Sequence, residues 1–255
     1  MGETILYKYL DAGGGLKMLN NSNLQFTNAT RLNDPFECHP SLIDFSKIPE
    51  DDPMLKNWGK EAAIDLASNR YERLRNDAWI CSLSKIHDSI LMWSYYGNQQ
   101  GICIGLNKDK VMECLSKVMN GVWIGAQLLE VQYKDMLEKP DYYHEPHNYY
   151  NYVLATKAKA WEHEREVRIL LMNPAIVQER VPDYIKDEYA DMREFRKLPK
   201  LTGDCFESLY LGIHIDAEKR EEIIEAAQKL NPKIKIYQMT IDPEALKLKE
   251  DKIEF

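Results

Sequence analysis

Glu164, Glu166 and Arg168 occupy alternate positions of one short segment, "EREVR", which turns apolar directly afterwards. In an extended strand, residues two apart project from the same face, so this spacing predicts that the three side chains address one space. Carboxylates about 7 Å apart along a strand could bind hydroxyl groups or exchange protons, and a guanidinium could keep one of them ionised. Glu166, Glu164 and Arg168 are therefore the candidate catalytic residues.

The same alternation also occurs on the solvated face of an ordinary exposed strand, where an ion pair contributes only about 0–1 kcal/mol. Trp161 stands just before the charged residues. Its indole could exclude water from the carboxylates and stack on a ligand ring, or it could belong to the core. We include Trp161 among the candidate ligand-binding residues.

Two serines, Ser82 and Ser84, share one face of the strand predicted at "CSLSK". Neither lies in a GxSxG motif, so neither is expected to be a hydrolase nucleophile. Their hydroxyls fit better as donors that line a pocket, although a polar outer strand face would have the same pattern.

The stretch "LNDPFE" is expected to form a turn, because Asn33 and Asp34 can hydrogen-bond their own backbone. We expect Phe36 to anchor this turn inward and Glu37 to be presented outward. Asn33 is a candidate ligand-binding residue, although an architectural role explains the stretch equally well.

Aromatic residues accumulate in "LMWSYYG", where Trp93, Tyr95 and Tyr96 lie beside a glycine that favours a helix end. Trp93 is a further candidate for ligand binding, although such stripes more often pack in a core. The glycines at 13–15 match no phosphate-binding motif and are expected to form a flexible turn.

No metal site is expected. The proline in "HEPH" disfavours the helix that would bring His144 and His147 together. The five cysteines are never spaced as CxxC, which fits reduced and mostly buried thiols: Cys38, Cys81, Cys103, Cys114 and Cys205.

The elements that must position these residues mix strands and helices without regular βαβ alternation. The patterns predict an α+β fold with mixed, mainly antiparallel sheets, in a single domain over residues 1–255. A strand–helix–strand element is expected at about 206–241. Helices are also expected from Leu16, from Pro53, at 90–96, 106–119 and 153–161, and a charged loop with a short helix is expected at 174–202.

The formal net charge of −8 argues against a general affinity for nucleic acid. The start of the chain resembles no signal peptide, and no apolar run approaches the roughly 20 residues that span a bilayer. We therefore expect a cytoplasmic protein that does not insert into membranes.

Several stretches together resemble a bacterial domain-of-unknown-function family, number 2971: "LNDPFE", "CSLSKIHDSILMWSYYG" and "KAWEHEREVRIL". More distantly, the order of motifs is similar to that of ADP-ribosyltransferases, which carry an aromatic, His or Arg on a first strand, a hydroxyl residue on a second and a catalytic Glu on a third. That fold binds NAD between two sheet halves. The first strand here lacks a clear Arg or His.

The distant resemblance implies an enzyme, of the toxin or phage-defence type, that uses NAD as substrate and modifies an unknown macromolecular acceptor. It implies that Glu166 steadies an oxocarbenium-like ribose and that Glu164 orients the acceptor. Arg168 would orient Glu166 or bind a phosphate. The implied NAD-binding residues are Tyr7, Lys8, Tyr9, Ser82 and Ser84.

Two other classes of function stay open. The polar pocket could bind a nucleotide or small metabolite without turnover. Alternatively, Glu164, Glu166 and Asp34 could hold a magnesium ion for phosphodiester hydrolysis, because hard cations prefer carboxylate oxygens.

Overall fold

The computed structural model describes residues 4–119, 122–124, 126–172 and 196–255. It is an α+β protein in which helices flank a mixed, mostly antiparallel sheet, so the predicted fold class is confirmed. Most of the segment expected as a charged loop at 174–202 lies outside the described residues.

The described residues form a 10-stranded sheet that consists of two halves. The first half runs in the order β14-β13-β12-β4-β1. Its strands are β1 (Ile5–Leu10), β4 (Ile102–Asn107), β12 (Phe206–Leu211), β13 (Lys235–Asp242) and β14 (Lys247–Lys252).

The second half is centred on β3, which pairs with β2 and with β10, and β10 pairs with β7. Its strands are β2 (Phe26–Asn28), β3 (Ala78–Ser84), β7 (Ala126–Glu130), β10 (Glu166–Met172) and β11 (Arg196–Lys197). Two short pairs lie outside the large sheet: β5 (Lys117–Met119) with β6 (Val122–Ile124), and β8 (Gln132–Lys134) with β9 (Thr156–Ala158).

The two halves meet at a narrow junction. β1 pairs with β4 along its whole length, whereas its pairing with β3 consists of Tyr7 opposite Ser84. Beyond this pair the two strands diverge, and the Lys8 ammonium donates to the carbonyl oxygen of Ser82 at 2.9 Å across the gap. The sheet is therefore split beside the residues expected to bind a ligand.

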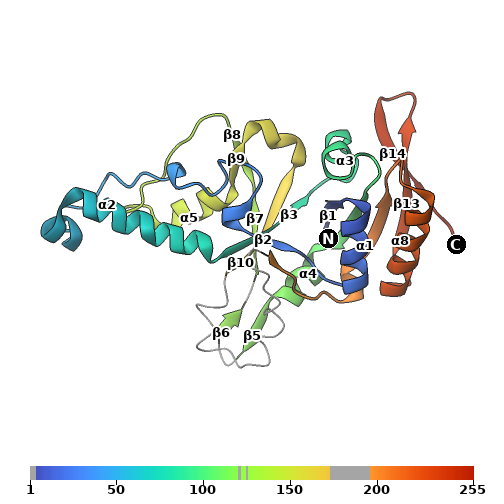
Figure 1. Cartoon of the computed structure of the whole chain (residues 1–255), viewed down its shortest axis with the longest axis horizontal. Coiled ribbons are helices and arrows are strands. Elements are labelled where there is room, and N and C mark those ends of the chain that lie inside the picture. The colour runs from blue at the N-terminus through green and yellow to red at the C-terminus, as the bar shows by residue number, and fades with distance from the viewer. Residues whose placement is uncertain (1–3, 120–121, 125, 173–195) are drawn as a thin grey trace.

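Helices cover both faces of the first half-sheet (Figure 1). α1 (Ala12–Asn21) and α8 (Ala217–Leu230) lie side by side on the face that carries Ile102 and Ile104. α3 (Ile90–Gly97) packs on the opposite face, where Trp93 contacts Tyr9 edge to face. α4 (Lys108–Leu115) follows β4 directly.

The second half-sheet is covered by α2 (Pro53–Asn76) and α5 (Pro146–Ala155). Their buried residues pack against Ile80 of β3 and Leu170 of β10. Four short 3-10 helices complete the described chain: η1 (Ala29–Arg31), η2 (Pro40–Leu42), η3 (Lys159–Glu164) and η4 (Gly203–Cys205).

Three element predictions were wrong. The helix expected at 106–119 ends at Leu115, and the chain continues as β5. The glycines at 13–15 lie inside α1, because the Asp11 side chain caps this helix through Gly14 N and because Gly15 packs against Ile102 where no β-carbon would fit. The helix expected at 153–161 instead ends at Ala155, and the chain continues as β9 and then η3. The strand–helix–strand element is present as β12, α8 and β13, with parallel strands.

Candidate functional site

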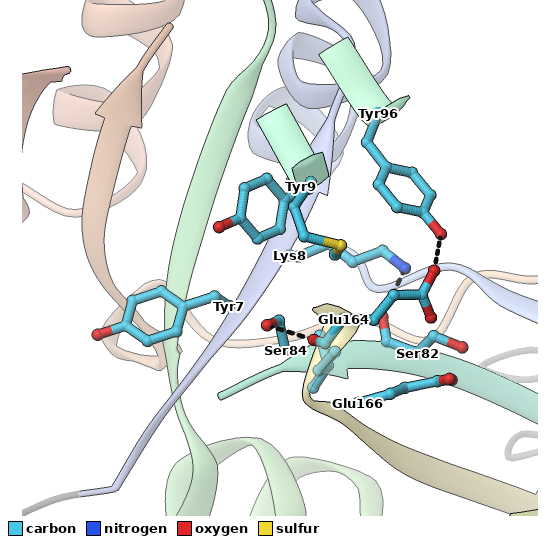
Figure 2. Close-up of a pocket in the computed structure, with 10 residues that line it drawn as sticks. Tyr7, Lys8, Tyr9, Ser82, Ser84, Tyr96, Glu164 and Glu166 are labelled. Atoms are coloured by element: carbon cyan, nitrogen blue, oxygen red, sulfur yellow. Dashed lines mark hydrogen bonds between the residues drawn. The ribbon is translucent and has the colours of Figure 1, made fainter. Parts of the chain in front are cut away.

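A pocket opens where β1 and β3 diverge (Figure 2). Its empty volume is about 330 Å³, including its open mouth. β1, β3 and α3 form its walls, and the two glutamates complete it. The lining residues are Tyr7, Lys8, Tyr9, Ser82, Leu83, Ser84, Met92, Tyr96, Glu164 and Glu166.

Glu164 reaches this pocket from a turn and not from a strand, which corrects the sequence prediction. It is the last residue of η3, Arg165 follows in the left-handed conformation (φ 48°), and β10 begins at Glu166. The turn is held by the Ser84 hydroxyl, which donates to the Glu164 carbonyl oxygen at 2.7 Å. Both glutamates still line the same pocket, because the turn directs the Glu164 side chain into the space that Glu166 faces from β10.

Lys157 of β9 lies between the carboxylates. Its ammonium donates to Glu164 Oε2 and to Glu166 Oε2, the latter at 3.1 Å, and approaches Glu37 Oε1 to 3.5 Å. Lys157 and the three glutamates are each at most 4% exposed. In such a place an unpaired charge would be very unfavourable, so the cluster depends on these contacts.

Arg168 is the second cation of the cluster. Its Nε donates to Glu166 Oε1 at 2.8 Å, its Nη1 donates to the Leu154 carbonyl oxygen at 2.8 Å, and its Nη2 pairs with Glu37. The side chain is fully buried. Arg168 therefore orients Glu166. Its described contacts are with groups of the protein itself.

Burial and charge perturb the protonation of this cluster. Burial raises the pKa of Glu166, and the Lys157 ammonium and Ser82 hydroxyl offset this only in part. Burial disfavours the charged form of Lys157, but Glu166 and Glu164 outweigh it and raise the Lys157 pKa above its ordinary value. Burial lowers the pKa of Arg168 to about 10, against the opposing effect of Asp34.

Two tyrosines contact the glutamates. Tyr96 of α3 donates its hydroxyl to Glu164 Oε1 at 2.8 Å, as Figure 2 shows. Burial and the charge of Glu164 raise the Tyr96 pKa, which keeps this hydroxyl a donor. The hydroxyl of Tyr133 accepts the Glu166 backbone N–H at 2.7 Å, and burial raises its pKa to about 12.

The tyrosines of β1 line the other end of the pocket. The Tyr9 hydroxyl donates to the Ile86 carbonyl oxygen at 3.1 Å, and burial raises the pKa of Tyr9. Tyr7 lies in a cluster of rings, with its centroid 5.0 Å from that of His87 and 5.9 Å from that of Tyr210. Tyr7 and Tyr9 thus present aromatic surface opposite the carboxylates.

The remaining candidates do not line this pocket. Trp93 is buried in the core below α3 and donates its indole N–H to the His87 carbonyl oxygen. Asn33 is exposed in its turn. The Trp161 ring lies near the cluster without lining the pocket, with Lys157 Nζ 5.0 Å from its centroid.

The predicted orientations in "LNDPFE" were reversed. Phe36 is 61% exposed, whereas Glu37 is buried against Arg168 and Lys157. Asp34 Oδ1 accepts from the Phe36 backbone N–H, and Asp34 Oδ2 is buried with no hydrogen-bond partner among the described residues. The cationic cluster attracts Glu37 more strongly than the local turn pattern indicates.

Sequence reasoning did not single out Lys157, Glu37, Tyr96 or Tyr133 as site residues. Lys157 was assigned to a helix, which concealed that its strand runs directly into the charged turn. The closest indication of these residues in the sequence is the excess of acidic residues in "EHERE". If such carboxylates are buried, cations must lie near them. Nothing in local spacing indicates which lysine supplies that charge.

The described part of the chain has no group of three or more His, Cys, Asp or Glu residues placed to hold a metal ion. None of its helices is both long and apolar enough to cross a membrane.

The fold and site define an α+β protein with a split sheet, an open pocket at the split and a buried ionic cluster that forms one wall. Residues 92–169, which include most of α3, Lys157 and both pocket glutamates, match the family model "Protein of unknown function (DUF2971)". The family predicted from the sequence is thereby confirmed over this segment. The comparisons with curated proteins and with solved structures returned no match.

Proposed function

We propose that the protein is an NAD-dependent enzyme of the ADP-ribosyltransferase type, with Glu166 as its central catalytic carboxylate. The observation that carries this proposal is one row of residues across three adjacent strands. Tyr7 of β1 is opposite Ser84 of β3, and Ser84 is opposite Glu166 of β10. Along the chain, these residues follow the order of aromatic, hydroxyl and Glu that the distant resemblance implies.

The split of the sheet supports the same reading. The pocket lies between two sheet halves, and an aromatic wall faces a carboxylate wall across it. A nicotinamide ring could pack on Tyr7 or Tyr9, while the attached ribose reaches the glutamates.

The reaction would break the bond between ribose C1′ and the pyridinium nitrogen. The bonding electrons go to that nitrogen, neutral nicotinamide leaves, and the ribose becomes an oxocarbenium-like cation. The Glu166 carboxylate stabilises this positive charge, and Arg168 and Lys157 hold Glu166 in place. An acceptor nucleophile then attacks C1′ and loses a proton to Glu164, the other pocket carboxylate, which Tyr96 holds in place.

The test is incubation of the intact chain with NAD, followed by measurement of released nicotinamide and of mass added to candidate acceptors. Glu166→Gln should lower nicotinamide release about 10²–10³-fold, the usual cost of losing one electrostatic stabiliser of a transition state. Glu130→Gln, which changes an exposed carboxylate on β7, is the matched control and should leave release unchanged. Untouched NAD in the wild-type chain would overturn the proposal.

A non-catalytic binding module is the second candidate, and one observation favours it. Both oxygens of Glu166 are already engaged by Arg168 and Lys157, so the carboxylate has little freedom to act. Calorimetry that detects saturable NAD or nucleotide binding without product would support this alternative.

The magnesium-dependent phosphodiesterase has less support. It needs Asp34 beside both glutamates, but Asp34 does not line the pocket, and Glu164 and Glu166 face Lys157 instead.

A further inference from the structure

A row of aromatic rings lies beside the residues that line the pocket. Tyr95 precedes the pocket residue Tyr96 on α3, and His163 precedes Glu164 on η3. The Tyr95 and His163 ring centroids are 5.7 Å apart, and those of His163 and Trp161 are 6.1 Å apart. These three residues form what we call the aromatic ledge.

The ledge is accessible from solvent at its Tyr95 end. Tyr95 is 64% exposed, and Leu91, one helical turn earlier on the same face of α3, is 46% exposed. At the other end, the ammonium of Lys157 lies below the Trp161 ring and links the ledge to the buried cluster. Exposed ring surface of this kind, next to a polar pocket, is suited to stacking with a planar group.

The size of the pocket indicates what kind of ligand would carry this planar group. The space of about 330 Å³ counts open solvent at the mouth as well as the enclosed part, so the pocket itself is smaller than a typical small-molecule site of about 300–1,000 Å³. It can enclose at most one end of an extended ligand. A dinucleotide carries a second nucleoside, which must lie outside the pocket.

We propose that the aromatic ledge is a second subsite, in which Tyr95 stacks on the adenine ring of a dinucleotide whose nicotinamide end enters the pocket. His163, whose ring is tilted 50° from that of Tyr95, contacts the edge of the adenine. This inference rests on the proposed use of NAD and assigns the second half of that substrate. Stacking of a base on an aromatic side chain contributes about 1–3 kcal/mol, so loss of Tyr95 should weaken NAD binding about tenfold.

The test compares three probes on the intact chain by calorimetry: NAD, nicotinamide mononucleotide and AMP. Tyr95→Ala should weaken binding of NAD and AMP about tenfold and leave nicotinamide mononucleotide unaffected, because that probe has no adenine. His163→Ala is the second variant. Trp58→Ala is the matched control, because it removes a ring that is 73% exposed on α2 and does not line the pocket.

The outcomes separate the subsite from the proposed function. If the wild-type chain binds NAD and neither ledge variant weakens this binding, the subsite is wrong while the use of NAD stands. If the wild-type chain binds neither NAD nor nicotinamide mononucleotide, the proposed function fails. The calorimetric measurement with AMP then tests the subsite by itself. AMP binding that is lost in Tyr95→Ala supports the subsite, and absence of AMP binding overturns it.

Discussion

Lys157 is the residue on which the ionic cluster depends. It is the one cation that contacts Glu37, Glu164 and Glu166 together in the described part of the chain. Arg168 contacts two of the same glutamates. Three carboxylates and two cations thus share a space from which water is nearly excluded, and each ion is stabilised by its neighbours.

Replacement of Lys157 by Met should therefore destabilise the protein by about 3–5 kcal/mol, because it leaves buried carboxylates uncompensated. Urea denaturation would measure the loss of unfolding free energy. Lys159→Met is the control, since Lys159 is exposed and pairs with Asp135 at the surface; its effect should stay within about 0.5 kcal/mol. Adding Glu164→Gln to Lys157→Met should recover part of the stability, and failure to do so would contradict the charge argument.

The raised pKa of Glu166 predicts the pH dependence of the proposed reaction. The ionised carboxylate is the active form, so nicotinamide release should increase as pH rises through this pKa and fall below it. Burial is the main cause of the shift, so the midpoint of the acidic limb should lie above the ordinary glutamate value of about 4.3. The pH profile of kcat/KM measures this midpoint. A midpoint at or below the ordinary glutamate pKa would argue against ionised Glu166 as the group that activity requires.

At the scale of elements, α1 shows how a local signal can be overruled. Three consecutive glycines normally disfavour a helix. Here Asp11 caps the first turn, and the helix packs closely on β4 because Gly15 has no side chain. Gly15 is thus a requirement of packing between helix and sheet, whereas β-carbons at Gly13 and Gly14 would meet only Asp11.

This packing predicts different effects at two positions of the same helix. Gly15→Ala should destabilise the protein by about 1–3 kcal/mol, because the new β-carbon would overlap Ile102 Cδ1. Gly13→Ala is the control: its β-carbon would meet Asp11 Oδ1 at 3.3 Å, and alanine favours the helix. Thermal or urea unfolding of both variants measures the difference, and equal effects would show that the close approach to β4 is not needed.

At the scale of the whole molecule, one apolar core spans both half-sheets. It includes Leu6 of β1 and Leu209 of β12 from the first half, and Leu83 of β3 and Val167 of β10 from the second. The pocket lies at the divergence of the two halves, and the shared core holds its walls in position.

We therefore expect the chain to unfold as one cooperative unit, as the predicted single domain requires. Circular dichroism and tryptophan fluorescence should give coincident transitions in urea. All five tryptophans contribute to the fluorescence, and among them Trp79 lies in the shared core on the second half-sheet and Trp93 packs against the first. Two separate transitions would show that the halves are independent domains.

The sequence by itself determined features that depend on neighbouring residues. The helices expected from Pro53 and at 90–96 are present as α2 and α3, and their starts are capped by the side chains of Asp52 and Ser89. The spacing of Glu166 and Arg168 correctly placed both on one strand face, where they are in contact. Such patterns reflect backbone geometry within a few residues, so they can be recognised without the fold.

Only the tertiary structure decided which charges meet. Glu37 pairs with Arg168 across 131 residues of sequence, and Tyr96 reaches Glu164 across 68. Burial makes an unpaired charge unfavourable, so Glu37 joins the cluster from a distant segment and overrides its local turn preference. Lys157 lies only seven residues before Glu164, but it reaches the cluster because its segment forms β9 and not the expected helix. The pocket itself exists because β1 and β3 diverge after a single pair, Tyr7 and Ser84. This divergence depends on how the two half-sheets pack, which no local pattern of residues indicates.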